Sequence, residues 1–353
     1  MSFTFGVEEE AFIVDADTLK HIAYRSKSLK KALKASDLNI SSEIYDCQIE
    51  LKTKVHRDFN CLAEELIQNR QALRNLLKNF NLDLFINGSM PDFDVSNAWC
   101  TPKDYYLNYY YSMCIYTSCM QFLSTQFHVA SDQCHDYSAF INVIGELSPI
   151  FLNLSASSPF FHYSDNAYHS NRFIEYRKVP MLLDIVSGDC EQVRGAPYPI
   201  YGTLRATPYN TLELRVCDSI RSIQDCLSLL ALYVSLFDTL LSSPPQHLSF
   251  FTSNNPFVYH NHWYASIHPP KVYVHRIADQ KKLYTLNEMM IELVDFITPS
   301  AKKLGCFSHL DHLFHMIEVG NDAIHQKKIK NELHSLYGLK RKIIEEAFVT
   351  EIK

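Results

Sequence analysis

The feature that most constrains the fold of this chain is a set of short stretches in which apolar residues alternate with acidic residues, His or Arg. The stretches cover residues 5–10, 46–51, 127–129 and 211–216. Side chains of a β-strand point alternately to the two faces of a sheet, so residues two apart share a face. The alternation therefore predicts strands that have one apolar face and one charged face.

The charged positions of these stretches are expected to gather in one cavity if the strands join one sheet. Carboxylates packed together repel one another and their pKa values rise, unless divalent cations neutralise them. Such oxygen-rich sites suit Mg²⁺. The solvated face of an antiparallel sheet gives a similar alternation, and this alternative stays open. The pairs expected to share a face are Glu8 with Glu10, Asp46 with Glu50, and Glu213 with Arg215.

Composition narrows the class of protein. The chain has 353 residues, of which 47% are hydrophobic, so it can bury a large core. No Ser/Gly-rich or charge-block linker divides it, which favours one domain over residues 1–353. The net charge is −6 and no block of Lys and Arg is present. These values argue against a nucleic-acid partner and against an anionic membrane surface.

The cysteines and the start of the chain bear on the compartment. Ten cysteines are scattered without a C-x-x-C pair, and residues 1–4 lack a basic region followed by a long apolar stretch. We therefore expect reduced thiols in a cytoplasmic protein without a secretion signal. The apolar stretch from Leu227 to Leu241 contains Ser228, Ser235 and Asp238, and is expected to form a core helix instead of a membrane span.

Helical periodicity separates the predicted strands. Leucines at helical spacing predict a helix from Asn60 to Phe80, with Asp58 or Asn60 as its cap, and an aromatic-rich helix is expected from Tyr105 to Leu123. From about residue 285 the chain is expected to be helical. Strands in the first two thirds and helices in the last third predict an α+β fold with a mostly antiparallel sheet.

The segment from Val179 to Thr211 is rich in Pro and Gly, which break regular elements. Loops of this length inside a compact domain are uncommon, and they often cover a functional site. The segment is therefore a candidate lid, and an ordered insertion without functional consequence is an equally good interpretation.

Six short motifs follow one another along nearly the whole chain. They are Gly6-Val7-Glu8-Glu9-Glu10, the segment from Asp46 to Thr53, the stretch from Leu154 to Phe160, the pair Asp165 and Arg172, the segment from Arg205 to Asp218, and Gly320-Asn321-Asp322-Ala323. In this order they resemble the glutamate-cysteine ligase type 2 family of ATP-dependent carboxylate-amine ligases. The resemblance implies a glutamine synthetase-like catalytic fold, in which the sheet forms a curved, open, barrel-like site flanked by helices.

The sequence departs from the family's pattern at three places. Gln126 stands for one His of an H-V-H-V strand, and Met90 for the His of a G-T-H-P turn. Tyr264 and Ile267 stand where the family's E-N-x-W-R-A-A-R segment carries arginines. Tyr and Ile cannot replace a bidentate cation that holds a phosphate or a carboxylate. The departures leave open which substrate the chain would take.

The resemblance implies that ATP phosphorylates a substrate carboxylate and that an amine then attacks the acyl phosphate, with ATP and Mg²⁺ as cofactors. Arg215 is expected at the γ-phosphate and acyl phosphate, together with Glu213 as the catalytic pair; a structural salt bridge between the two is the alternative. Arg172 and Arg205 are expected to hold nucleotide phosphates or the acceptor carboxylate, unless they are surface residues. The expected metal ligands are Glu8, Glu10, Glu50 and Glu213, with Asp46 and His128 as weaker candidates.

Two functions follow from these observations. The first is an active ligase that joins an amino acid, glutamate in the family, to an amine. The second is a non-catalytic nucleotide- or amino-acid-binding regulatory protein of the same fold. The lost arginines and histidines favour the second function, whereas the retained acids favour the first, because unpaired buried charges cost several kcal/mol. A metal hydrolase is disfavoured because no H-E-x-x-H motif is present. The resemblance also suggests a homodimer.

Overall fold

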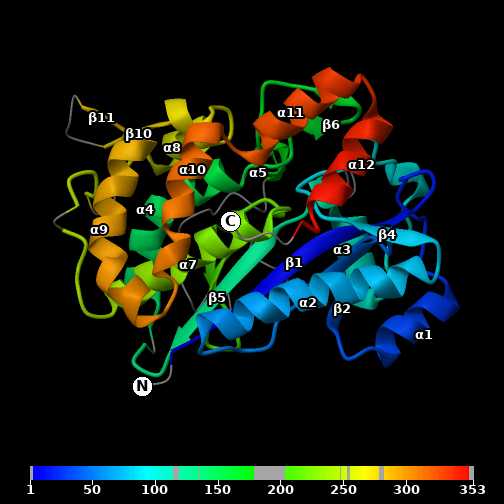
Figure 1. Cartoon of the computed structure of the whole chain (residues 1–353), viewed down its shortest axis with the longest axis horizontal. Coiled ribbons are helices and arrows are strands. Elements are labelled where there is room, and N and C mark those ends of the chain that lie inside the picture. The colour runs from blue at the N-terminus through cyan, green and yellow to red at the C-terminus, as the bar shows by residue number, and fades with distance from the viewer. Residues whose placement is uncertain are drawn as a thin grey trace.

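The sheet is organised around its longest strand, β1 (Phe3–Asp15), which pairs with three other strands. The computed structural model in Figure 1 describes residues 3–113, 119–134, 136–178, 203–246, 248–252, 255–277 and 282–349. Every pair in the sheet is antiparallel, and the strand order is β2-β3-β1-β5-β9-β8, with β4 beside β1. The other strands of this sheet are β2 (Asn39–Ser42), β3 (Gln48–Lys52), β4 (Leu82–Phe85), β5 (Thr125–Ser131), β8 (Leu204–Ala206) and β9 (Leu212–Leu214).

Helices surround this sheet, and two small hairpins lie outside it. The helices are α1 (Lys27–Ala35), α2 (Phe59–Lys78), α3 (Asp104–Met113), α4 (Ser138–Ser155), α5 (Asn171–Tyr176), α7 (Ile223–Leu240), α8 (Val258–Ala265), α9 (Leu286–Lys303), α10 (Asp311–Val319), α11 (Asp322–Leu333) and α12 (Leu336–Glu346). The hairpins are β6 (Phe160–Phe161) with β7 (Ser164–Asp165), and β10 (Val274–Arg276) with β11 (Leu283–Thr285). Among the residues described, this is an α+β fold with an antiparallel sheet, as the alternation predicts.

Helix α2 covers the apolar face of the sheet and crosses in front of β1 in Figure 1. Its Leu62 and Leu66 pack in one cluster with Phe5 and Val7 of β1, and its Leu73 and Leu77 pack in another with Ala11 and Ile13. Asp58 caps the helix, since its side chain accepts a hydrogen bond from the backbone of Cys61. The even-numbered residues of β1 therefore face away from α2.

One acidic residue of β1 lies on the α2 side of the sheet. Glu9 is buried, and Arg70 of α2 donates two hydrogen bonds to its carboxylate, at 2.9 and 2.5 Å. Arg70 also donates to the backbone carbonyls of Ile220 and Arg221, just before α7. This buried pair fixes β1, α2 and the start of α7 relative to one another.

Among the residues described, two helices, α4 and α7, are long and apolar enough to cross a membrane. Within the fold, 72% of α4 and 83% of α7 are buried. Phe151 of α4 and Tyr233 of α7 touch, and α7 packs on α9 and α10, on the left of Figure 1. These contacts are those of core helices, in agreement with the prediction for Leu227 to Leu241.

Two sequence predictions need correction or fall partly outside the described residues. The expected helix from Tyr105 to Leu123 does not reach Leu123, whose backbone donates to Gly88. Helix α3 is described from Asp104 to Met113, and residues 114–118 lie outside the described part of the chain. The candidate lid is described only from residue 203, where Leu204–Ala206 form strand β8 and residues 207–210 a turn. Residues 179–202 lie outside the described part of the chain.

Replacing Arg70 by Met should destabilise the fold by about 3–5 kcal/mol, because it leaves the Glu9 carboxylate buried without its cation. The free energy of unfolding in urea measures this loss. The matched control is Arg341→Met, which breaks an exposed pair with Glu345 and should cost less than about 0.5 kcal/mol. Equal losses in the two variants would contradict the assignment.

Glu146, inside α4, predicts a pH dependence of stability. Burial raises the pKa of its carboxyl to about 7. Between pH 4.5 and 7 the folded state keeps a proton that the unfolded state has lost, so the free energy of unfolding should fall as pH rises through this range. Glu146 contributes at most about 1.4 kcal/mol per pH unit to this slope, and Glu146→Gln should make the slope shallower by that contribution. Glu318→Gln, at an exposed acid, should leave it unchanged.

Candidate functional site

The sheet face opposite α2 carries most of the predicted site residues, and we call it the charged face. The strand register places Glu10 opposite Glu50, Glu8 opposite Lys52 and Gln126, and Glu213 opposite His128 and Arg205. The apolar residues between them, such as Val7, Phe127 and Leu214, point to the core. The predicted sharing of one face is confirmed for Glu8 and Glu10, which stand opposite Lys52 and Glu50 of β3, and for Glu213 and Arg215, which are hydrogen-bonded to each other.

Glu213 is held by two arginines. Arg205 donates to one carboxylate oxygen at 2.6 Å, and Arg215 donates to the other. Glu213 is fully buried, which works against ionisation, but the two guanidinium groups hold its pKa below the usual range. The salt bridge considered as an alternative role of Arg215 is thus present, and Glu213 uses both of its oxygens in ion pairs.

Arg215 is linked to the acidic part of the face through Gln126. It donates to Oε1 of Gln126 at 2.5 Å, and Nε2 of the same amide donates to Oε1 of Glu10 at 2.7 Å. The second Glu10 oxygen accepts from the backbone N–H of Ser124. Glu10 therefore receives only neutral donors within hydrogen-bond range among the described residues. Burial raises the pKa of its carboxyl, although Arg215 and Arg172 oppose this.

Lys52 lies between Glu8 and Glu50. Its Nζ is 3.0 Å from Oε1 of Glu8 and 2.6 Å from Oε2 of Glu50. His128 stands on the other side of Glu8, with Nε2 at 3.7 Å from the carboxylate, and this nitrogen is buried without a hydrogen-bond partner in the described structure. Burial raises the pKa of Glu50 to about 8, with the Glu8 charge adding to the effect. Burial opposes ionisation of Glu8 too, but His128 and Lys52 lower the pKa of that group.

Three carboxylates converge beside this pair. Glu10, Glu43 and Glu50 each place one oxygen within 4.8 Å of the other two. We call them the carboxylate trio. No hydrogen bond or ion pair involves the Glu43 carboxylate in the part of the chain that is described, and burial together with the Glu10 and Glu50 charges raises its pKa well above the usual range.

Glu43 is a site residue that the sequence analysis missed. It follows the edge strand β2, and the pairing of Ser41 with Glu50 brings it over the charged face. Strand β2 is four residues long and has no strong alternation, so its sequence gave little signal. Once β2 and β3 are recognised as a hairpin, Glu43 falls on the face of Ser41, and its proximity to Glu50 follows.

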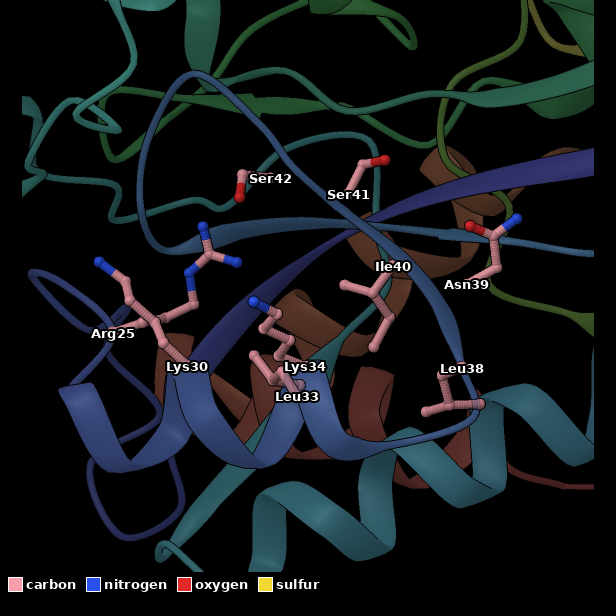
Figure 2. A pocket seen from close by; sticks show the side chains of 9 residues that line it. All are labelled: Arg25, Lys30, Leu33, Lys34, Leu38, Asn39, Ile40, Ser41 and Ser42. Atoms are coloured by element: carbon pink, nitrogen blue, oxygen red, sulfur yellow. The ribbon is translucent and has the colours of Figure 1, made fainter.

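The expectation that Asp46 shares a face with Glu50 is wrong. Asp46 lies in the turn before β3, because the strand begins at Gln48. Its carboxylate pairs with Arg25 at 2.8 Å and Lys30 at 2.8 Å, and these cations hold its pKa low against burial. Figure 2 shows Arg25 and Lys30 on a pocket between α1 and β2. Asp46 therefore neutralises this basic pocket and is not part of the carboxylate trio.

Arg172, on α5, completes the site on the side of Glu10. It is buried, and it donates to the backbone carbonyls of Arg215 and Val216, with Asp218 at 3.9 Å. Its Nε is buried without a partner among the described residues. One pocket is lined by Glu10, Glu43, Arg172 and Arg215 together with Tyr105 and Tyr176. This pocket brings carboxylates and guanidinium groups to one place, and Arg172 is not a surface residue.

The balance of charge on this face suits one divalent cation. Glu8, Glu10, Glu43, Glu50 and Glu213 are five carboxylates, and Lys52, Arg205 and Arg215 are three cations, so two negative charges remain when His128 is neutral. The excess lies on the carboxylate trio. Mg²⁺ binds oxygen ligands and carries two positive charges, so the donor set of the trio fits the cation that the resemblance implies.

Comparison with known proteins agrees with this geometry. The model of glutamate-cysteine ligase family 2 matches residues 4–332. The chain belongs to glutamate-cysteine ligase family 2. A putative glutamate–cysteine ligase 2 of Roseiflexus castenholzii is 24% identical over 98% of this chain and 94% of its own length. The corresponding relative in Nocardia farcinica is 24% identical over 92% of this chain and 90% of its own length.

Two solved structures share the fold of this family member. The glutamate–cysteine ligase of Francisella tularensis in complex with AMP superposes with a TM-score of 0.69 at 11% identity, covering 100% of this chain and 90% of that one. The bifunctional glutathione synthetase of Pasteurella multocida gives a TM-score of 0.58 at 12% identity, covering 99% of this chain and 53% of that one. The expected α+β ligase fold is thereby confirmed.

Glu43→Gln should weaken the binding of Mn²⁺, used as a probe for Mg²⁺, by about tenfold or more, because affinity at oxygen sites depends on the number of charged ligands. Asp46→Asn, in the same hairpin, should leave Mn²⁺ affinity unchanged and lower stability instead, since it unpairs Arg25 and Lys30. Calorimetric titration and urea unfolding separate the two effects. A larger loss of affinity in Asp46→Asn would contradict the position of the site.

Proposed function

We propose that this family member is an ATP-dependent carboxylate-amine ligase that activates the carboxylate of an amino acid as an acyl phosphate. Glutamate is the first carboxylate to test and cysteine the first amine, because the relatives carry those names. The observation that carries the proposal is the pocket in which two members of the carboxylate trio, Glu10 and Glu43, lie beside Arg172 and Arg215.

The chemistry needs charge neutralisation and positioning more than acid–base catalysis. In the first step an oxygen of the substrate carboxylate attacks the γ-phosphorus of ATP, the bond to the β,γ-bridging oxygen breaks, and ADP leaves. In the second step the amine nitrogen attacks the acyl carbon, phosphate leaves, and the nitrogen loses a proton. A bound Mg²⁺ supplies charge neutralisation for the nucleotide phosphates, and Glu10, Glu43 and Glu50 are the residues that would hold it.

The arginines of the pocket can serve the anionic groups of these steps. Arg215 is oriented by Glu213 and Gln126, so its guanidinium needs no reorganisation when a phosphoryl group arrives. Arg172 is oriented by two backbone carbonyls and has one buried N–H without a partner in the described structure. We assign Arg215 to the transferred phosphoryl group, and Arg172 to a second anionic group of the nucleotide or the amino acid.

A second candidate, a non-catalytic nucleotide-binding protein, is favoured by one observation. At Tyr264, where the family pattern carries an Arg, the aromatic ring stacks on His268 at 3.7 Å between ring centroids. The side chain therefore supplies packing and no cation. Arg177, which lies outside this helix, is over the ring of Tyr259 on α8.

The two candidates are separated by an assay of purified protein with ATP, Mg²⁺ and a panel of amino acids. We expect glutamate-dependent release of ADP, and transfer of ¹⁸O from labelled glutamate into the released phosphate, because the carboxylate oxygen becomes part of the acyl phosphate. Arg215→Met and Glu43→Gln should each reduce kcat by about 10²–10³. Asp46→Asn serves as the control for a neutralised acid outside the trio.

Binding of ATP without amino-acid-dependent turnover for any member of the panel would reject the ligase and leave the non-catalytic candidate. Release of phosphate without ¹⁸O transfer would reject the acyl phosphate specifically.

A further inference from the structure

Lys52 occupies an unusual place for a lysine on a face that is expected to bind metal. It is directly opposite Glu8 in the register of β1 and β3, and it is two residues from Glu50 on the same strand. Both acids are predicted metal ligands, and the ammonium group contacts both, at 3.0 and 2.6 Å. These contacts follow from the pairing of β1 with β3 and involve no other helix or strand.

An ammonium group at this point excludes a divalent cation from the same point. A metal shared by Glu8 and Glu50 would stand about 2.0–2.1 Å from their oxygens if it were Mg²⁺. The Lys52 ammonium already lies within hydrogen-bond range of both carboxylates and carries the same sign of charge. Like charges this close repel strongly in a partly buried site.

Lys52 neutralises half of the charge of these two acids. The side chain is only 27% exposed, and Glu8 and Glu50 are 20% and 8% exposed. Its single charge leaves one excess negative charge on the pair. Glu10 and Glu43 add two negative charges, whereas Glu213 with its two arginines carries one positive charge, so two negative charges remain on the face. One divalent cation on the carboxylate trio then brings the face to neutrality.

We propose that Lys52 is a built-in cation that replaces a metal ion between Glu8 and Glu50, so that the protein itself binds a single divalent cation, at the carboxylate trio. This inference rests on the proposed function in one respect, namely that the charged face binds divalent cations. Lys52 would act as a positioning residue for the acids and as a fixed positive charge beside the nucleotide phosphates. An ammonium is a compact, strongly hydrated point charge, which suits this role.

The test is the number of Mn²⁺ ions bound per chain, measured without nucleotide by electron paramagnetic resonance of free Mn²⁺. The wild-type protein should bind about one ion, and K52M should bind about two, because Glu8 and Glu50 then form a second carboxylate site. K52R keeps the charge and should bind as the wild type does. K54M removes an exposed lysine two residues along the chain and should also leave the number unchanged.

A second measurement guards against a packing defect. K52M leaves two neighbouring acids unpaired, so its unfolding temperature should be lower than that of the wild type and should recover on addition of Mn²⁺ by more than the wild type gains. K52Q, with a shorter neutral side chain, is measured in parallel and should show the same gain of an ion.

The inference is overturned if neither K52M nor K52Q binds more Mn²⁺ than the wild type, or if K52R gains an ion. A gain in the neutral variants would support it even if the ligase assay failed, because the readout is binding and not turnover. Conversely, turnover with an unchanged number of ions would remove this inference and leave the proposed function standing.

Discussion

The structure depends on the two-residue period of strand β1. Its odd-numbered residues pack against α2 and the core, and its even-numbered residues Glu8 and Glu10 face the opposite side. Because every neighbouring strand is antiparallel and in register, each adds its own alternate residues to the same two faces. A shift of one residue in any pairing would bury acids in the core and expose Phe and Leu.

Burial of so many acids is tolerated because each is compensated in a different way. Glu9 has an arginine on the far side of the sheet, Glu213 has two, and Glu8 and Glu50 share a lysine. Of the five acids on the charged face, only Glu10 and Glu43 lack a cation within 4 Å among the residues described. The uncompensated charge is thus confined to one corner of the face, where the pocket with Arg172 and Arg215 opens. The electrostatics of the fold select the place for a ligand.

The features that could be predicted from the sequence depend on spacing within one strand or on the order of elements along the chain. Glu8 with Glu10 and Glu213 with Arg215 follow from spacing within one strand, and the antiparallel α+β fold follows from the order of elements. Glu43 could not be predicted, because its position depends on how the short strand β2 pairs with β3. The prediction for Asp46 was wrong because strand β3 begins only at Gln48. Asp46 lies in the preceding turn, so its spacing of four residues from Glu50 does not place the two side chains on one face. The pairing of Lys52 with Glu8 is likewise a property of two strands.

The three acids of the carboxylate trio differ in how firmly the sheet holds their backbone. Glu10 and Glu50 stand on interior strands that are bonded on both sides, whereas Glu43 follows β2, the outermost strand of the sheet. Outermost strands fray first, because they have partners on one side only and open with a small free energy. A cation bound by all three acids would link the edge strand β2 to the interior of the sheet. Its release would loosen β2 and the adjoining helix α1. Binding of a cation at the trio would then be coupled to the local order of the hairpin.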